Sequence, residues 1–148
     1  TFDYLQRLLI LSVGKLQKPD NKTVFLYHLH FGLPYYTFKT GADTLETLLD
    51  TGMGGFLAIN EKSKNIFAFA EKKSDIQTTS SYYTGSAVLA TLKNRIEIGQ
   101  YAFYNCPIVI SSEEGHRMGS GIFQYFSLTF DQKNNTFRLL SKKQSIVF

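Results

Sequence analysis

A carboxylate stands directly after an apolar stretch in the segment Leu48-Leu49-Asp50-Thr51-Gly52. An apolar strand that ends on an ionisable group is unfavourable unless the carboxylate accepts hydrogen bonds or shares its charge with a partner. Gly52 has no Cβ, so its backbone amide can approach the Asp50 oxygens in a tight turn. Asp, Thr and Gly are also frequent turn residues, so the triplet alone equally fits an ordinary loop after a strand. The surrounding segments must decide between a reactive carboxylate and a plain turn.

The composition favours a single β-rich unit. The chain has 148 residues, the length of one ordinary domain or of one lobe of something larger. Its 13 Phe and 9 Tyr, with 3 Pro and no Trp, favour β-structure packed around aromatic side chains. The formal charge of +4 is mild and the lysines are spread along the chain, so a nucleic-acid partner is not indicated. No apolar run approaches the length of a membrane span, and no signal peptide is visible.

The Cys and His residues do not predict a metal or redox site. Cys106 is the only cysteine, which excludes an internal disulfide and a cysteine metal cluster, and its apolar context predicts a small core residue rather than a nucleophile. His28 and His30 would lie on one face of a strand, at a spacing that a metal site could use. A third ligand is missing, because His116 is distant in the sequence and no acid stands at a matching spacing. We expect the polar face of an amphipathic strand there, with no metal and no cofactor.

Segments rich in β-branched and aromatic residues alternate with Gly, Asn and Pro turns. We predict strands over residues 23–31, 35–40, 44–49, 56–59, 89–98 and 101–110, and a closing hairpin formed by residues 127–130 and 136–140. Asn60 is expected to cap a helical turn within residues 61–69, and residues 122–126 have the character of a short helix. Residues 71–75 are expected to be a solvated charged segment. The prediction is an all-β unit, mainly β with one or two short helices.

The order of these parts resembles a lobe of the aspartic proteases, the clan that includes pepsin and the retroviral proteases. Such lobes run through a hairpin, an Asp-Thr-Gly loop, a flap hairpin, an apolar-apolar-Gly segment, a short helix and a final hairpin. Residues 82–86 stand where the flap belongs and are similar to the Tyr-Gly-Thr-Gly-Ser of pepsin flaps. Arg117-Met118-Gly119 stands at the apolar-apolar-Gly position, and residues 120–131 are similar to the closing segment of bacterial retropepsin-like lobes. The resemblance covers about residues 23–140.

The resemblance implies a closed, β-barrel-like lobe of an aspartic endopeptidase, which hydrolyses peptide bonds with a water activated by two aspartates. Asp50 would be the catalytic residue that this chain supplies. Thr51 would bond across to the facing lobe, and Gly52 would shape the loop. A flap that closes over substrate and excludes water would contain Tyr82, Tyr83, Thr84 and Gly85.

The chemistry implied by the resemblance needs a second carboxylate. Two acids about 3 Å apart cannot both ionise, so such a pair holds one proton. The ionised member takes a proton from the water, and the protonated member polarises the scissile carbonyl, without metal, cofactor or covalent intermediate. The expected partners are therefore a peptide or protein substrate and a second aspartate-bearing lobe, either an N-terminal lobe of the same protein or a second copy. The resemblance also suggests a secreted or periplasmic protein.

Two residues depart from the family pattern. Ala, Ser or Thr usually follows the glycine, but this chain has Met53, which is long enough to crowd the carboxylate. Arg117 replaces an apolar residue in the second signature. Both fit either a specialised pocket or a lobe without catalysis, so the alternative function is a non-catalytic, protease-like binding or assembly module. A small β-barrel that binds nucleic acid or sugar through its aromatic residues has only weak support from the charge.

The start of the chain echoes a segment near its other end. Thr1-Phe2-Asp3 recurs as Thr129-Phe130-Asp131, and at the same offset Leu9 falls opposite Phe137. A coincidence between two short β-segments would explain this echo equally well. We expect residues 1–22 to be a terminal strand and linker, either the end of a preceding lobe or an equivalent edge strand, and residues 23–148 to be the protease-like lobe. The offset has the size of one lobe, which favours the preceding lobe, and the first residue suggests a processed or trimmed piece. The apolar start must pack on this lobe, on a preceding one or on a second chain.

Overall fold

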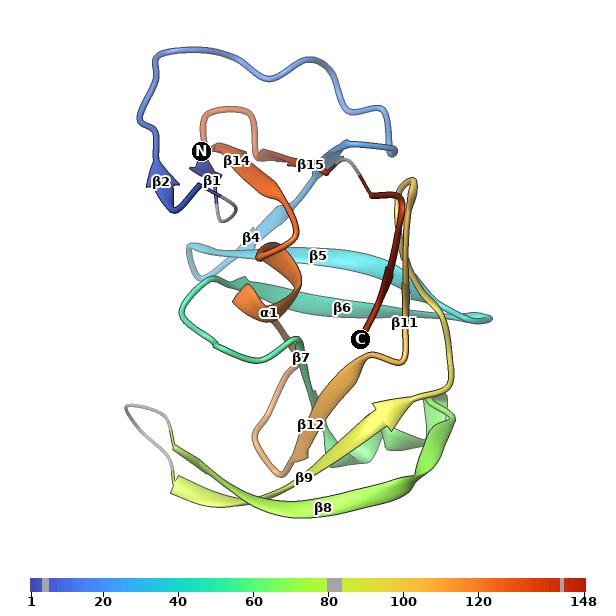
Figure 1. Cartoon of the computed structure of the whole chain (residues 1–148). Coiled ribbons are helices and arrows are strands. Elements are labelled where there is room, and N and C mark those ends of the chain that lie inside the picture. The colour runs from blue at the N-terminus through green and yellow to red at the C-terminus, as the bar shows by residue number, and fades with distance from the viewer. Residues whose placement is uncertain (4–5, 80–83, 142) are drawn as a thin grey trace.

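The computed structural model of the chain describes residues 1–3, 6–79, 84–141 and 143–148. These residues form mainly short β-strands, which confirms the predicted all-β class (Figure 1). In chain order the elements are β1 (Phe2–Asp3), β2 (Leu8–Leu9), β3 (Val24–Leu26), β4 (His28–His30), β5 (Leu33–Thr40), β6 (Asp43–Asp50), β7 (Leu57–Asn60), the 3-10 helix η1 (Glu61–Ile66), β8 (Phe69–Thr79), β9 (Thr84–Leu92), β10 (Ile96–Ile98), β11 (Tyr101–Tyr104), β12 (Pro107–Ser111), β13 (Arg117–Gly119), the helix α1 (Ser120–Phe123), β14 (Ser127–Asp131), β15 (Thr136–Leu140) and β16 (Ser145–Val147).

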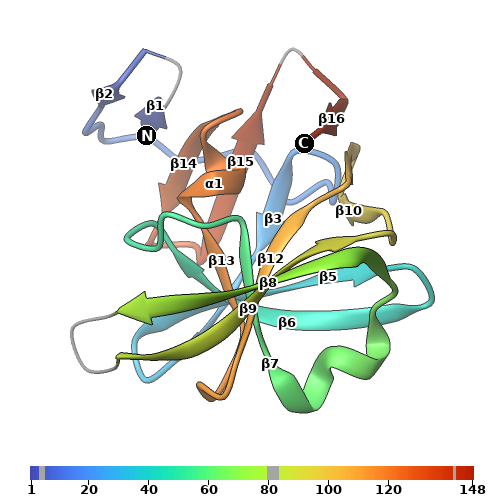
Figure 2. The same cartoon turned by 60° about the horizontal axis from the view of Figure 1, so that its bottom comes forward.

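The strands belong to two sheets. The smaller sheet has five strands in the order β2-β1-β14-β15-β3. The larger has 11 strands, in the order β16-β11-β10-β5-β6-β13-β7-β12-β9-β8, with β4 paired to β5. The larger sheet curls into a half-barrel around the core (Figure 2). Its centre is not sequential: β13 lies between β6 and β7, parallel to β6 and antiparallel to β7.

Several predicted strands are divided in the structure. Residues 23–31 do not form one strand, because β3 belongs to the smaller sheet and β4 to the larger. A turn at Phe31 and Gly32, both with positive φ, then connects β4 to β5, and β5 begins at Leu33 rather than at residue 35. Residues 101–110 divide into β11 and β12 at Asn105, whose φ of 53° belongs to the left-handed region. Left-handed residues interrupt a strand that composition alone predicts as continuous.

The charged stretch after η1 is part of a strand. Residues 71–75 belong to β8, which pairs with β9 at the edge of the larger sheet. An edge strand accommodates charged side chains because one side of it meets water. Residues 89–98 likewise divide into the end of β9 and β10, with a break after Leu92.

Both predicted helical segments are present but displaced or shortened. Asn60 caps η1 as predicted, with its side-chain oxygen accepting a hydrogen bond from the Lys62 amide at 2.8 Å. The helix ends at Ile66 because Phe67 is extended. Helix α1 begins at Ser120, two residues before the predicted start. Within the described residues, no helix is both long and apolar enough to cross a membrane.

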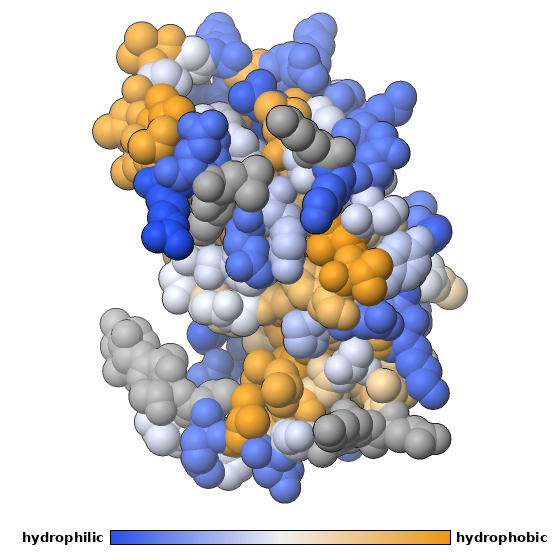
Figure 3. All heavy atoms as spheres, viewed as in Figure 1, coloured by the Kyte–Doolittle hydropathy of each residue, from blue (hydrophilic) through white to orange (hydrophobic). Residues whose placement is uncertain are grey.

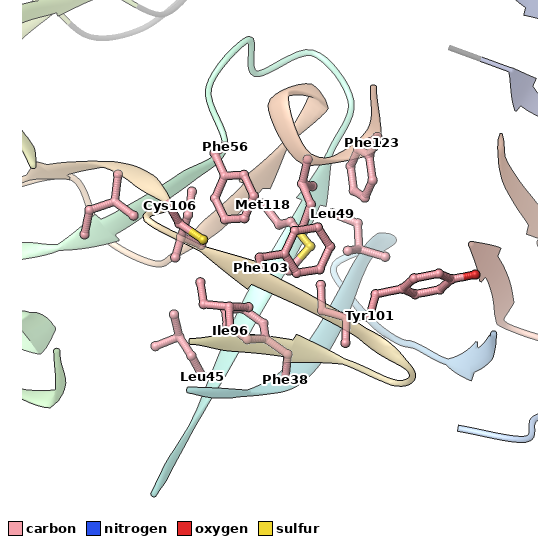
Figure 4. Close-up of a cluster of buried hydrophobic side chains, with 14 of the residues drawn as sticks. Phe38, Leu45, Leu49, Phe56, Ile96, Tyr101, Phe103, Cys106, Met118 and Phe123 are labelled. Carbon is pink, nitrogen blue, oxygen red and sulfur yellow. The ribbon is translucent and has the colours of Figure 1, made fainter. Parts of the chain in front are cut away.

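Aromatic side chains fill the core between the curled sheet and α1. Figure 4 shows Phe56, Phe103 and Phe123 pointing into the same space. The rings of Phe56 and Phe103 lie 5.7 Å apart, in an edge-to-face arrangement that aromatic pairs prefer. Burying each such ring contributes about 1.5–3 kcal/mol. The hydroxyl of Tyr101 donates to the carbonyl of Leu139 at 3.0 Å, which links the larger sheet to the smaller one.

Cys106 provides a test of this core. Its thiol is fully buried, and burial raises its pKa to about 12, so the reactive thiolate is scarce at neutral pH. We expect the folded protein to resist a thiol-specific reagent at pH 8 and to react stoichiometrically once it is unfolded in guanidinium. A Val147→Cys variant is the control, because Val147 is exposed on β16 and its thiol should react at once. Rapid labelling of Cys106 in the native protein would contradict the observed packing.

Candidate active site

Asp50 is the last residue of β6, and its half-buried carboxylate is held by the loop that follows. Its Oδ1 accepts a hydrogen bond from the Gly52 amide at 3.0 Å and another from the Met53 amide at 3.2 Å. A Cβ on Gly52 would lie 3.3 Å from this oxygen, a tight contact. The turn therefore has the form that the sequence predicts, with a glycine amide close to the carboxylate.

A second segment, residues 119–121, holds this loop from the other side. The amide and the hydroxyl of Ser120 both donate to the carbonyl of Met53, at 2.7 and 2.8 Å. The Gly121 amide donates to the carbonyl of Gly55 at 2.9 Å, and the Gly119 amide donates to the carbonyl of Phe56 at 3.0 Å. Residues 53–56 are therefore bonded to the end of β13 and the start of α1.

The contact between these two backbones requires glycine. A Cβ built on Gly119 would lie 2.4 Å from the carbonyl oxygen of Gly55 and 2.6 Å from that of Met53. A Cβ on Gly121 would lie 2.7 Å from the same Gly55 oxygen. Backbone atoms cannot yield as a flexible side chain can, so any larger residue would push the loop away. The sequence signature marked Gly119 as important, but its contact with the loop was not predicted.

The two departures from the family pattern have definite positions. The Met53 side chain turns toward Gly119, since a Cβ there would lie 2.7 Å from the Met53 methyl carbon. Arg117 lies opposite Leu48 on β6, and its guanidinium pairs with Glu113 at 3.4 Å. The predicted crowding of the Asp50 carboxylate by Met53 stays a prediction.

Only two of the four predicted flap residues lie in the described part of the chain. Tyr82 and Tyr83 lie outside the described residues. Thr84 and Gly85 are the first residues of β9 and pair with Thr79 and Thr78 of β8. The described end of this β8–β9 ribbon and residues 51–56 lie on the same side of the molecule (Figures 1 and 2), and the surface between the ribbon and the rest of the molecule is hollowed (Figure 3). That this ribbon acts as a flap stays a prediction.

Two hollows lie near these elements. One, of about 550 Å³, adjoins the Asp50 loop and is lined by Leu49 and Thr51 together with Phe2, Tyr27 and Phe130. The other, of about 580 Å³, lies between η1, β8, β9 and β12 and contains no residue of the Asp50 loop. The first hollow is lined by both neighbours of Asp50 in the chain, although the second hollow is slightly larger.

His116 was not singled out as a site residue, and it has a structural position close to the Asp50 strand. Its Nδ1 accepts a hydrogen bond from the Asn60 amide at 3.2 Å, and its Nε2 lies 3.3 Å from the hydroxyl of Ser63. Its carbonyl accepts from the Leu48 amide on β6 at 2.9 Å. Because Nδ1 is an acceptor, the proton resides on Nε2, so His116 cannot act as a base toward Ser63. It connects β6, β7 and η1.

The described part of the chain holds no cluster of three or more His, Cys, Asp and Glu residues that could bind a metal. His28 and His30 are exposed on β4. The Nε2 of His28 lies 3.2 Å from an oxygen of Glu46 on the solvent side of the sheet.

Comparison with known proteins supports the fold. No family model matches the chain, and no curated protein matches it by sequence. Among solved structures, the chain is similar to a retropepsin-like aspartic protease from Rickettsia conorii, with a TM-score of 0.59 over 78% of this chain and 87% of that one, at 13% identity. The fold is retropepsin-like. At this identity the likeness concerns the backbone alone, so roles of individual residues need their own test. The resemblance inferred from the sequence is thus confirmed for the fold.

Gly119 and Gly54 provide a matched pair for testing the close contact with the loop after Asp50. We expect Gly119→Ala to lower the free energy of unfolding by about 2–4 kcal/mol, since overpacking against backbone forces the loop to move. Gly54 lies in the loop that Gly119 contacts, but nothing lies within 4 Å of a Cβ added there. Gly54→Ala should therefore change the free energy of unfolding by less than about 1 kcal/mol. Urea unfolding of both variants measures the difference. Equal effects would mean that the loop does not depend on close approach at Gly119.

His116 predicts a pH dependence of stability. Burial lowers the pKa of its imidazole below the ordinary value of 6.5, so the folded state favours the neutral ring. The stability from this group is therefore complete above pH 6.5 and is lost as the pH falls through 6.5 toward the folded pKa. Urea unfolding between about pH 7.5 and 5 should show a larger loss for the native protein than for His116→Gln, which cannot titrate. Parallel curves for the two proteins would contradict this role.

Proposed function

We propose that this chain is one lobe of an aspartic endopeptidase and that Asp50 is the carboxylate it supplies to a two-aspartate site. The retropepsin-like fold supports the class of protein. The position of Asp50 supports the site, because a carboxylate at the end of a central strand is held in one orientation by its own loop.

The geometry of the Asp50 carboxylate carries the proposal. Among the described residues, Oδ1 of Asp50 is the oxygen engaged by hydrogen bonds, both from backbone amides. Oδ2 is left for a water or for a facing acid. Amides that fix one oxygen pre-orient the other, and pre-orientation avoids reorganisation during the reaction. A surface aspartate in an ordinary turn would not need a second backbone segment, residues 119–121, bonded against its loop.

The reaction proposed for Asp50 requires a facing carboxylate. With two acids about 3 Å apart, one proton is shared between them. The ionised acid takes a proton from the water as it attacks the peptide carbonyl, and the protonated acid donates to the carbonyl oxygen. Thr51 is exposed beside Asp50, and in this proposal it bonds to the facing lobe. The β8–β9 ribbon would cover the bound peptide and exclude water during the reaction.

The decisive variant is Asp50→Asn in the full-length protein. The amide has the shape of the carboxylate but cannot act as the base, so we expect peptide cleavage to fall by at least about 10²–10⁴-fold. The unfolding midpoint should change little. Asp43→Asn, at the exposed start of the same strand, is the control and should cleave normally. Cleavage assays on a mixed peptide library at acidic and neutral pH measure the effect.

The outcomes separate the candidate functions. Full activity in Asp50→Asn would move the chemistry elsewhere. A native protein that binds peptides without cleaving them at any pH would favour the alternative, a protease-like lobe acting as a binding or assembly module.

A further inference from the structure

The N-terminal hairpin β1–β2 has the same pairing as the closing hairpin β14–β15. The paired residues are Phe2 with Leu9 and Asp3 with Leu8 in the first hairpin, and Phe130 with Phe137 and Asp131 with Thr136 in the second. Each residue of the first hairpin corresponds to one of the second at a constant separation of 128 residues, the separation of Thr1 from Thr129. The sequence repeat is therefore accompanied by the same strand register in both hairpins.

The described residues of the two turns also correspond. In each, the Asp carboxylate accepts a hydrogen bond from the amide three residues later, at 2.9 Å for Asp3 and 3.2 Å for Asp131. A left-handed residue follows at the same place, Arg7 with φ of 57° and Asn135 with φ of 49°. Residues other than glycine rarely adopt positive φ, so this agreement at one separation indicates a structural repeat.

The two hairpins are related by a local two-fold axis. Strand β1 pairs antiparallel with β14, with Phe2 opposite Leu128 and Asp3 opposite Ser127. The same register brings Thr1 to Thr129, and their hydroxyl oxygens lie 2.8 Å apart. Thr1 and Thr129 are equivalent positions of the two hairpins. An antiparallel pair in which equivalent residues face each other is two-fold symmetric, and the axis passes between them.

The two hairpins differ in what covers their apolar side chains. Phe137 and Leu139 are 1% and 0% exposed, because they pack into the core of this lobe. Their counterparts Leu9 and Leu11 are 60% and 87% exposed. The apolar area at the upper left of Figure 3 lies over this hairpin, and a patch of this kind marks a surface that normally meets another protein segment. The N-terminal hairpin thus has the strand pairing of the closing hairpin, but no core covers its apolar side chains.

We infer that residues 1–11 are the closing hairpin of a second lobe of this same fold, which precedes this lobe in the polypeptide and faces it across the axis between Thr1 and Thr129. The occupant of the apolar face at Leu9 and Leu11 is the core of that lobe. This inference names the partner that the proposed protease function requires, and it rests on that function for the role of the second acid.

A second copy joined through β14 does not fit the same observations. Strand β14 has β15 on one side and β1 of the same chain on the other, so a second copy could pair with β14 only by displacing β1. The hollow beside the Asp50 loop is bounded by Phe2 and Thr51 and therefore opens between the N-terminal hairpin and the candidate site. A lobe built on the hairpin would cover this hollow. If the lobes are of equal length, its aspartate stands roughly 80 residues before Thr1.

Leu11→Asp tests the inference in the protein expressed from its own start codon. In this lobe Leu11 is exposed, but in the inferred one it is core, so the charge should lower the unfolding midpoint by about 5 °C or more. Val147→Asp is the control, because Val147 is 67% exposed on β16, and it should leave the midpoint nearly unchanged. Equal midpoints for the two variants would overturn the inference.

A cross-link provides an independent measurement. Thr1→Cys combined with Thr129→Cys should form a disulfide within one polypeptide, because the two side chains meet across the local axis. Denaturing electrophoresis without reductant should then show a monomer. A covalent dimer would mean that β1 pairs with β14 of a second copy, and the two-lobed chain would be excluded.

These results are separable from the test of activity. If Asp50→Asn abolishes cleavage but Leu11→Asp is neutral and the cross-link joins two chains, the protease function stands and the inferred lobe falls. If Leu11→Asp destabilises, the cross-link is internal and Asp50→Asn still cleaves, the lobe stands and the function falls.

Discussion

The candidate site depends on a close contact between two backbone segments, residues 119–121 and residues 53–56. No side chain fits between them at Gly119 or Gly121. Met53 connects the contact to the candidate chemistry: its carbonyl accepts two hydrogen bonds from Ser120, and its amide donates to Oδ1 of Asp50. The orientation of the carboxylate thus depends on a segment 67 residues further along the chain.

The order of strands explains why this contact exists. Strands β6 and β7 are consecutive in the chain but not neighbours in the sheet, because β13 lies between them. The connection from Asp50 to Leu57 must therefore cross the end of β13 at Gly119, which stands directly opposite Asp50. Met118, one residue earlier, is buried in the aromatic core and holds β13 in this place. The core therefore fixes β13, and the end of β13 fixes the loop after Asp50.

What the sequence could predict was local. The Asn60 cap, the closing hairpin and the Asp50–Gly52 turn each depend on residues a few positions apart, and each is present. The parallel pairing of β13 with β6 joins distant segments, so no periodicity indicates it. Strand ends at left-handed residues such as Asn105 were missed for a related reason, since Asn adopts that conformation only where the surrounding structure requires it. The structural role of His116 was not predicted because its partners, Asn60 and Ser63, are more than 50 residues away.

The segment that fixes the Asp50 loop also leads into the sheet that contains the local axis. Helix α1 follows Gly119 directly, and β14 begins four residues after the helix ends. Ile122, Phe123 and Phe126 are fully buried, so this connection cannot tilt without disturbing the core. In the two-lobed arrangement inferred above, each lobe would present such a rigid connection to the axis at Thr1 and Thr129. The distance between the two carboxylates would then be set by backbone packing in both lobes and would not depend on the rotation of a flexible side chain. A water held between two acids needs that kind of precision, because a small displacement of either acid breaks the shared hydrogen bonds.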